Sequence, residues 1–337
     1  MTTAVPATHR EVRLAARPQG PLRTGHFRMA EVPVPAAVPG TVLVRNQMMS
    51  VAAVMDTLVR GATDLPMPPY EPGDVLAGPA IGVVIAAPGT DFKPGDLITH
   101  NGGWREYALV DETDAQRIDP ESLPDAAAHL SQGLTAWLGV VRGAEVRAGD
   151  TVFVTAAAGG VGSLAGQFAR LRGATRIIGS TSSRRKGRYL VEELGYDAVV
   201  TRDAGPIEDQ LREAAPAGID AVFDNVGGEQ LRAALAVARR GGRVALVGTL
   251  SGQMSGSLSA PVEIDTGALI LRGITVRGMS GSDHLDAIPE WFRAFSRGLH
   301  EGTLTFPHTR LSGIDQAPRA LCELIEGRHV GAVLVEL

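Results

Sequence analysis

From about residue 126 onwards, short apolar runs rich in β-branched residues alternate with stretches in which apolar residues recur at helical spacing. The apolar runs predict strands at 151–155, 176–180, 198–201, 220–224, 242–248 and 273–277. The amphipathic stretches predict helices at 163–172, 184–195, 207–215, 228–238 and 262–271. Strands that alternate with crossover helices form parallel sheets, so this part of the chain is predicted to be an α/β domain with a doubly wound sheet.

The first 125 residues follow a different pattern. Short β-like runs at 40–45, 80–85, 96–99 and 106–110 are separated by proline and glycine turns, which indicates a mostly antiparallel, barrel-like sheet. The tail shows helical patterns at 285–299 and 317–326 and a last apolar strand at 331–336. We expect that strand to return to the first sheet, because it needs an edge to pair with. The predicted domains are a mostly β domain of residues 1–125 and 281–337 and an inserted α/β domain of residues 126–280.

Composition narrows the class of protein. The chain has 337 residues, of which 44% are hydrophobic and 20% charged, and this length suggests two domains. Its net charge of −5 argues against general binding of nucleic acid, which usually needs a basic surface. No stretch has the roughly 18 consecutive apolar residues of a membrane span. We therefore expect a cytoplasmic protein with a small-molecule substrate and without nucleic-acid or membrane partners.

The stretch 151–172 has the pattern of a phosphate-binding turn. A buried strand at 151–155 leads into Gly159, Gly160 and Gly162, and an amphipathic helix follows. Glycines at such positions let the backbone turn tightly and approach a pyrophosphate, while the N–H groups at the start of the helix hold the anion. The pattern predicts a dinucleotide site.

The end of the second predicted strand indicates which dinucleotide. An NAD-preferring site places a carboxylate there for the ribose 2′-hydroxyl, about 20 residues after the glycines. This chain instead has four hydroxyl residues at 180–183, followed by Arg184, Arg185 and Lys186. Cations without a carboxylate favour a 2′-phosphate, so NADP(H) is preferred over NAD(H). The alternative is a solvated basic helix start without a ligand.

Metal chemistry has little support in the sequence. Cys322 is the only cysteine, which excludes an intrachain disulfide and a structural zinc site built from thiolates. The eight histidines are scattered without the spacing of metal ligands. We predict no metal site.

Several motifs together resemble the medium-chain dehydrogenase/reductase superfamily over nearly the whole chain. They are Pro72-Gly-Asp74, Pro94-Gly-Asp96, Gly103-Trp-Arg-Glu-Tyr107, Gly133-Leu-Thr-Ala136, the glycine turn at 156–162, Lys186-Gly-Arg-Tyr-Leu190, Leu194-Gly-Tyr-Asp197 and Phe223-Asp-Asn-Val-Gly-Gly228. Within the superfamily the chain is most similar to the zinc-free alkenal double-bond reductases and prostaglandin reductases, with quinone oxidoreductases nearby. The resemblance implies a Rossmann domain inserted into a GroES-like catalytic domain.

The resemblance also implies a set of cofactor residues. Gly159, Gly160, Val161 and Gly162 would hold the pyrophosphate, and Lys186 would bind the 2′-phosphate. Where the family has a tyrosine after the third strand, this chain has Arg202, which could strengthen the contact with the 2′-phosphate. Ser180 and Thr181, at the end of the second strand, are further candidate cofactor residues. The nicotinamide half would contact Asn225, Val226, Gly248, Thr249 and Leu250, with Thr135 behind the ring. Asn225 has a plainer alternative as a turn residue before two glycines.

The substrate side departs from the family pattern. Family reductases often carry one tyrosine after the fifth strand of the nucleotide-binding sheet and another ahead of the Pro68-Pro69 pair, and both are missing here. Tyr70, Ser50 or Gln47 could donate a hydrogen bond in their place, although each also fits an ordinary structural role. The segment 56–61 is more like the quinone oxidoreductases.

The resemblance implies an NADPH-dependent reductase that transfers hydride to the carbon β to a carbonyl in an enone or enal. An NADPH:quinone oxidoreductase is the nearest alternative. A protein that binds NADPH for a non-redox role, as a lyase, isomerase or scaffold, is an alternative of another class. Relatives often dimerise by pairing the last strand of the nucleotide-binding sheet, so a homodimer through residues 273–277 is expected.

Overall fold

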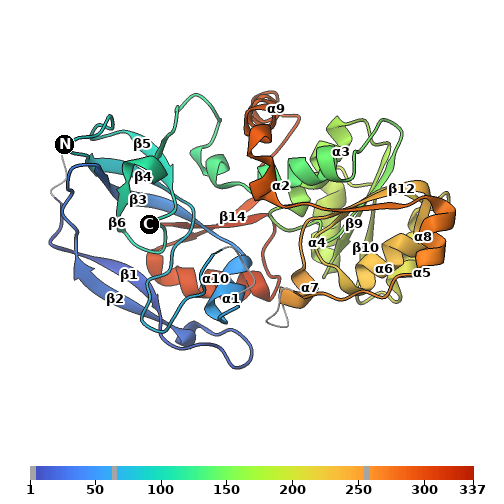
Figure 1. Cartoon of the computed structure of the whole chain (residues 1–337), viewed down its shortest axis with the longest axis horizontal. Helices are drawn as coiled ribbons and strands as arrows, with labels where there is room; N and C mark the ends of the chain where they lie inside the picture. Colours follow the sequence, from blue (N-terminus) through green and yellow to red (C-terminus); the bar gives the residue numbers. More distant parts are fainter. Residues whose placement is uncertain (1–4, 63–66, 254–258) are drawn as a thin grey trace. The chain divides into compact units, whose positions relative to one another are not determined.

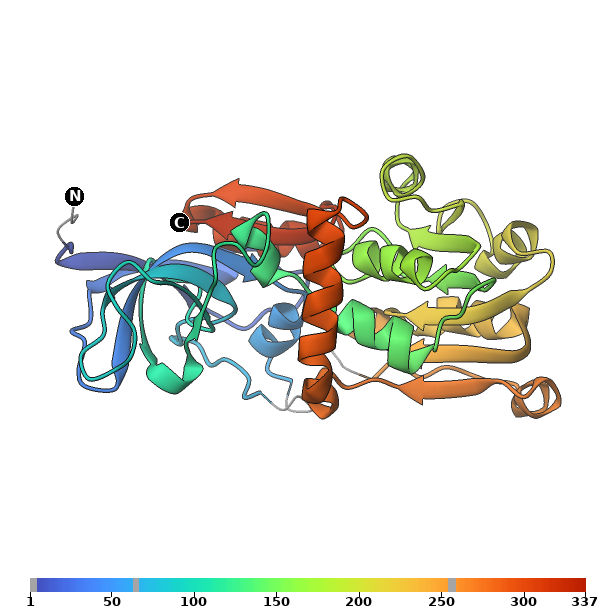
Figure 2. The ribbon, with the colours of Figure 1, turned by 90° about the horizontal axis from the view of Figure 1, so that it is seen from above.

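The computed structural model describes residues 5–62, 67–253 and 259–337, and the chain divides into two compact units. The first unit comprises residues 1–130 and 308–337, and the second comprises residues 131–307. Figures 1 and 2 show the chain coloured along its sequence. The second unit is thus inserted into the sequence of the first.

The second unit contains a six-stranded sheet in the order β10-β9-β8-β11-β12-β13, and all neighbouring strands are parallel. The strands are β8 (Thr151–Val154), β9 (Arg176–Thr181), β10 (Ala198–Thr201), β11 (Ile219–Asp224), β12 (Ala238–Leu246) and β13 (Thr275–Gly278). The strand order reverses between β8 and β11. This confirms the predicted doubly wound sheet, in which ligands bind at the carboxyl ends of the strands near the reversal.

Helices connect these strands close to the predicted positions. They are α3 (Gly162–Leu171), α4 (Arg184–Glu192), α5 (Ile207–Ala214), α6 (Gly228–Val237), α7 (Leu250–Gln253) and α8 (Thr266–Arg272). The helices and strands enclose an apolar core in which Phe153, Ile178 and Val222 are almost completely buried. The buried strands are apolar on both faces, as crossover sheets require.

A short helix of the second unit precedes the first strand of this sheet in the sequence. The helix α2 (Gly133–Leu138) continues as a π-helical turn, η4 (Gly139–Gly143). A Cβ atom at Gly139 would lie 2.2 Å from the ring of Phe223, so only glycine allows the helix to pack this closely on β11. The glycine at position 139 therefore fixes the depth at which this helix lies on the sheet.

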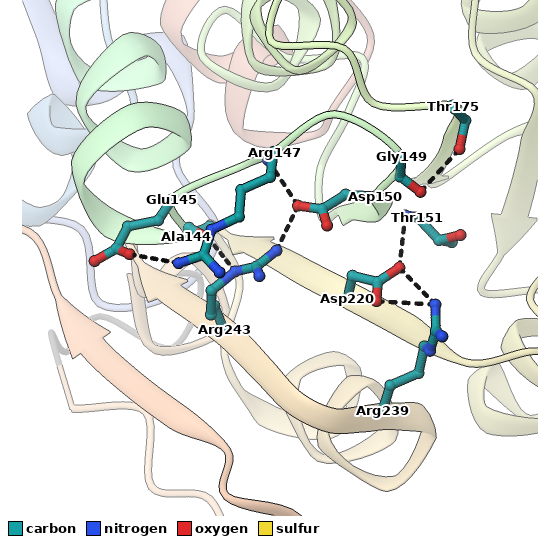
Figure 3. A network of polar contacts seen from close by, with 10 residues as sticks. All are labelled: Ala144, Glu145, Arg147, Gly149, Asp150, Thr151, Thr175, Asp220, Arg239 and Arg243. Carbon is teal, nitrogen blue, oxygen red and sulfur yellow. Dashed lines mark hydrogen bonds and ion pairs between the residues drawn. The ribbon is translucent and has the colours of Figure 1, made fainter.

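Charged residues join the amino ends of the central strands (Figure 3). Asp150, directly before β8, forms an ion pair with Arg243 of β12. Asp220 of β11 accepts a hydrogen bond of 2.9 Å from the backbone N–H of Thr151 and lies 3.0 Å from a guanidinium nitrogen of Arg239. These contacts lie at the amino ends of the strands, opposite the carboxyl ends where a ligand is expected. They therefore stabilise the sheet without taking part in the expected ligand site.

The second unit extends further along the chain than the predicted boundary at residue 280. The segments η5 (Gly281–Ala287) and α9 (Ile288–His300) belong to it. Phe295 of α9 packs on Phe168 of α3 with ring centres 6.4 Å apart, and the backbone N–H of Thr305 donates to Gln167 at 2.8 Å. Because these contacts tie residues up to Pro307 to the nucleotide-binding sheet, the assignment of 281–307 to the mostly β domain is corrected.

The first unit contains a seven-stranded sheet in the order β14-β15-β3-β4-β5-β7, with β6 paired to β3. Its strands are β3 (Thr41–Val51), β4 (Ala80–Ala86), β5 (Leu97–His100), β6 (Tyr107–Asp111), β7 (Gln116–Arg117), β14 (His308–Ser312) and β15 (Ala332–Glu336). The last strand, β15, pairs antiparallel with β3, where Val333 lies opposite Val51. The final strand therefore returns to the first unit, as the sequence predicts.

Two further strands of the first unit, β1 (Thr8–Leu14) and β2 (Phe27–Pro33), form a separate antiparallel pair. Their inner residues Val12, Leu14 and Phe27 join a core that also contains the helices α1 (Val54–Val59) and α10 (Ala317–Ile325). Over the described residues, the structure contains no helix with the length and apolar character needed to cross a membrane.

Candidate cofactor site

The turn after β8 is shaped by a close backbone approach at Gly162. A Cβ atom at Gly162 would lie 2.4 Å from the carbonyl oxygen of Ala156, whereas one at Gly159 would lie 3.4 Å from the same oxygen. Ala156 itself has a φ of 50°, which a residue with a side chain seldom adopts. The start of α3 is therefore drawn onto the turn, with its first backbone N–H groups at the carboxyl end of β8, where a phosphate binds in such folds.

Ser180 supports this turn from the neighbouring strand. Its hydroxyl accepts a hydrogen bond of 3.0 Å from the backbone N–H of Ala156 and donates one of 2.5 Å to the side chain of Gln230. The side chain is almost completely buried. The structure thus places Ser180 behind the turn, where its hydroxyl is occupied by the protein. Thr181, the next residue, ends β9 and is also buried.

Tyr196 is a second support that the sequence analysis missed. Its hydroxyl donates a hydrogen bond of 2.8 Å to the carbonyl oxygen of Gly162, and its ring occupies the space left by Gly166 and Gly179. Burial raises the pKa of this phenol, which therefore stays protonated and keeps donating. The sequence signal for this contact is a pair of glycines, Gly166 on α3 and Gly179 on β9, which leave room for the ring.

Lys186 is a buried cation at the end of β9. Ser183 caps the helix α4 by accepting a hydrogen bond from the backbone N–H of Lys186 at 3.4 Å. The Lys186 side chain is 7% exposed, and no carboxylate forms an ion pair with it in the described parts of the chain. Burial, together with Arg185 and Arg202, lowers the pKa of Lys186 to about 8. A buried ammonium group beside two other cations is unfavourable. A bound anion would stabilise the charged form of Lys186 at this end of β9.

The predicted nicotinamide residues come together at the carboxyl ends of β11 and β12. The backbone N–H of Leu250 donates to the carbonyl oxygen of Asn225 at 3.0 Å, and that of Ser251 donates to Val226 at 3.0 Å. A Cβ atom at Gly248 would lie 2.8 Å from the carbonyl oxygen of Asn225. These contacts hold the segment 248–251, including Thr249, against residues 225–226.

Two predicted cofactor residues lie apart from these contacts. Thr135 is in α2, where its carbonyl oxygen accepts from the N–H of Gly139. Arg202 follows β10 and is exposed, and it is near enough to Lys186 to lower its pKa. Neither side chain hydrogen-bonds to the glycine turn within the described residues.

The two candidate catalytic residues belong to the first unit. Ser50 is a buried residue of β3, and its backbone N–H donates to Pro79 at 2.9 Å. The Tyr70 hydroxyl accepts a hydrogen bond of 3.0 Å from the backbone N–H of Ala77 and donates one of 3.2 Å to the carbonyl oxygen of the same residue. Burial raises the pKa of Tyr70, so this phenol is protonated and already engaged.

Asp56, the first residue of the segment 56–61, forms an ion pair within the first unit. Both of its carboxylate oxygens lie 3.0 Å from Nε of Arg60, and the carboxylate is almost fully buried. The guanidinium of Arg60 also donates to the carbonyl oxygen of Gly20 at 3.0 Å. This pairing makes Asp56 a structural residue of α1.

Metal ligands do not gather in the described residues. Over residues 5–62, 67–253 and 259–337, no group of three or more His, Cys, Asp or Glu side chains is placed to hold an ion. Cys322, the single cysteine of the chain, is buried, and burial raises its thiol pKa to about 11.

Two protein-family models match the chain. A model described as "N-terminal domain of oxidoreductase" matches residues 10–118, and one described as "Zinc-binding dehydrogenase" matches residues 160–297. The second match includes Gly160 and Gly162 of the glycine turn, Lys186 and Asn225. Its description refers to zinc, although this chain has one cysteine.

Individual proteins match over nearly the full length. The putative NADP-dependent oxidoreductase YfmJ of Bacillus subtilis (strain 168) is 32% identical, over 98% of this chain and 98% of that protein. The NADPH-dependent curcumin reductase of Escherichia coli (strain K12) is 27% identical, over 96% of this chain and 95% of that protein. The crystal structure of CurA from Vibrio vulnificus in complex with NADPH has a TM-score of 0.88 and 26% identity, over 97% of this chain and 98% of that one.

Proposed function

Because this chain belongs to the zinc-free medium-chain dehydrogenase/reductase superfamily, we propose that it reduces an activated carbon–carbon double bond, as in an enone or enal. The protein is an NADP-dependent oxidoreductase, and NADPH is its cofactor. What is proposed is the acceptor and the point of attack, namely hydride transfer to the carbon β to a carbonyl group.

The buried Lys186 is the observation that carries the cofactor assignment in this chain. Its ammonium group lacks a carboxylate partner in the described residues and lies near two arginines, which suits a 2′-phosphate. The N–H groups at the start of α3 suit the pyrophosphate. Asn225 and Leu250, which are joined by a backbone hydrogen bond, are the residues proposed for the nicotinamide half. NADPH bound there supplies the hydride.

The choice of acceptor rests on what the residues offer for activation. A ketone or aldehyde needs a strong electrophile or acid at its oxygen, and no metal-ligand group is found in the described residues. An enone is already electrophilic at its β-carbon, so the protein has mainly to orient it and exclude water. The relative named as a curcumin reductase supports this class, since curcumin contains C=C bonds conjugated to carbonyl groups.

The developing enolate oxygen needs a hydrogen-bond donor. Ser50 and Tyr70 remain the proposed donors of the first unit. The Tyr70 hydroxyl donates to the carbonyl oxygen of Ala77 at 3.2 Å and would have to exchange that partner for the substrate. Replacing Ser50 by Ala should then lower kcat, with KM for NADPH unchanged.

We also propose a homodimer through the free edge of β13. This strand pairs only with β12 in the described sheet, and the neighbouring helix α8 exposes Ile270 and Leu271 at 79% and 74%. An unpaired strand edge beside exposed apolar side chains suits association with a second copy. Light scattering of the wild type and of a variant with Ile270→Glu and Leu271→Glu tests this, and a wild-type monomer would refute it.

The reaction is tested by NADPH consumption at 340 nm with matched enones and quinones. Enone turnover to the saturated ketone supports the proposal. Turnover of quinones alone would support a quinone oxidoreductase, which the segment 56–61 suggests. NADPH binding without turnover of either panel would point to a non-redox role of the bound cofactor.

A further inference from the structure

Asp224 is a buried carboxylate at the end of β11, directly before the predicted nicotinamide residues. It is completely buried. Its oxygens accept hydrogen bonds from the hydroxyl of Thr155 at 2.9 Å and from the backbone N–H groups of Gly227 at 2.8 Å and Val226 at 3.3 Å. All partners in the described residues are neutral, and burial raises the pKa of this carboxyl. Burying a carboxylate costs free energy unless it is hydrogen-bonded. Here the three hydrogen bonds offset that cost and hold the turn in place.

Thr155 links this turn to the strand that carries the phosphate-binding glycines. Its hydroxyl donates to Asp224 and at the same time accepts a hydrogen bond of 2.7 Å from the backbone N–H of Asn225. The Thr155 hydroxyl therefore has a fixed direction. It joins the carboxyl ends of β8 and β11, the two strands between which the strand order reverses.

The same residue fixes the side chain of Asn225. The amide Nδ2 of Asn225 donates to the backbone carbonyl oxygen of Thr155 at 2.9 Å. The Asn225 Oδ1 accepts no hydrogen bond from the described part of the chain, and the residue is half-buried. Asn225 thus offers an acceptor in one orientation, which suits a carboxamide N–H or a ribose hydroxyl of the cofactor.

We propose that Thr155 and Asp224 are positioning residues, which act through Asn225 to hold the nicotinamide half of NADPH. The proposal rests on the cofactor placement under Proposed function. Thr155 sets both the backbone and the side chain of Asn225, and Asp224 sets the direction of the Thr155 hydroxyl. The adenine half, which Lys186 serves, does not depend on this network.

The test compares two ligands on four variants. NADPH spans both halves of the site, whereas adenosine 2′,5′-bisphosphate occupies only the adenine half. Thr155→Val removes the hydroxyl at nearly constant volume, Thr155→Ser keeps it, and Asp224→Asn removes one acceptor oxygen. Thr151→Val is the matched control, because it removes a hydroxyl from the opposite end of β8 that makes no hydrogen bond in the described residues.

Thr155→Val and Asp224→Asn should raise the Kd for NADPH by about tenfold, the size expected for one hydrogen bond to a charged group. The Kd for the bisphosphate should not change, and Thr155→Ser and Thr151→Val should match the wild type. A loss of both ligands in parallel would overturn the proposal, because it would indicate general damage to the unit.

A double-mutant cycle separates positioning from a merely structural role. If Thr155 acts through Asn225, the variant carrying both Thr155→Val and Asn225→Ala should bind NADPH no more weakly than Asn225→Ala alone. Additive losses would contradict the proposal. A wild type that binds the bisphosphate but not NADPH would refute the cofactor placement as well, whereas failure of enone turnover alone would leave these binding results intact.

Discussion

The hydroxyl of Ser180, on the second strand of the nucleotide-binding sheet, accepts a hydrogen bond of 3.0 Å from the backbone N–H of Ala156 in the phosphate-binding turn. This contact fixes the turn in a left-handed conformation at Ala156. Replacing Ser180 by Ala leaves that N–H without its partner. We expect the free energy of unfolding to fall by about 1 to 3 kcal/mol.

The Ser180→Ala variant should bind NADPH more weakly, because the turn at Ala156 would no longer be fixed to β9. Urea denaturation and fluorescence titration measure the two effects. Ser182→Ala is the control, since Ser182 is exposed and its side chain makes no hydrogen bond in the residues that the structure describes. Equal behaviour of the two variants would show that Ser180 does not support the turn.

Two glycines of the turn should tolerate substitution very differently. Gly162→Ala would bring a Cβ to 2.4 Å from a backbone carbonyl oxygen that cannot move freely, and we expect a loss of stability of about 3 kcal/mol or more with loss of NADPH binding. Gly159→Ala meets the same oxygen at an ordinary 3.4 Å and should stay within about 1 kcal/mol of the wild type. Thermal unfolding of both variants checks this, and similar losses would contradict the account.

The affinity for NADPH should depend on pH through Lys186. Its pKa of about 8 in the unliganded protein means that the ammonium is charged below pH 8 and loses its charge above it. The Kd for NADPH should therefore be constant near pH 7 and rise above pH 8, by at most about tenfold per pH unit. The Kd for NADH should not follow this curve, because it lacks the 2′-phosphate.

Lys186→Arg provides the control for this pH dependence, since a guanidinium stays protonated throughout the range. Its Kd for NADPH should change little between pH 7 and 9.5. Identical pH curves for the two proteins would show that another group is responsible for the dependence.

Tyr70 should behave as a structural residue. Tyr70→Phe removes the hydroxyl that binds both backbone groups of Ala77, so we expect a loss of stability of about 1 to 2 kcal/mol with an unchanged kcat. Denaturation and steady-state kinetics on an enone measure the two quantities. A large fall in kcat at unchanged stability would instead assign Tyr70 to catalysis.

Local patterns in the sequence predict the parallel sheet and the glycine turn between β8 and α3 well. Runs such as 151–155 are apolar and β-branched, and their strand character depends on neighbouring residues alone. The strand β1 was missed because arginine and glutamate alternate with its apolar residues Val12 and Leu14, and only the pairing with β2 buries one face. The domain boundary at residue 280 was misplaced because the docking of α9 on α3 depends on Phe168 and Phe295, which are far apart in sequence.

The cofactor site shows the same limit. The glycine spacing predicts a pyrophosphate site from sequence, and the absence of an acid after β9 predicts a 2′-phosphate site. The supports were not predicted, because Thr155 and Asp224 meet across two neighbouring strands and Tyr196 fills space left by distant glycines. The contact of Ser180 with the cofactor stays a prediction; the structure adds that its hydroxyl also bonds to Ala156 and Gln230.

The most direct test of the account is product analysis of the purified protein with NADPH and an enone, with the matched saturated ketone as the control substrate. The account predicts that one NADPH is consumed for each molecule of enone that is converted to the saturated ketone. It also predicts that the control substrate is not reduced. Reduction of the carbonyl group to an alcohol, or turnover of quinones without turnover of enones, would contradict it.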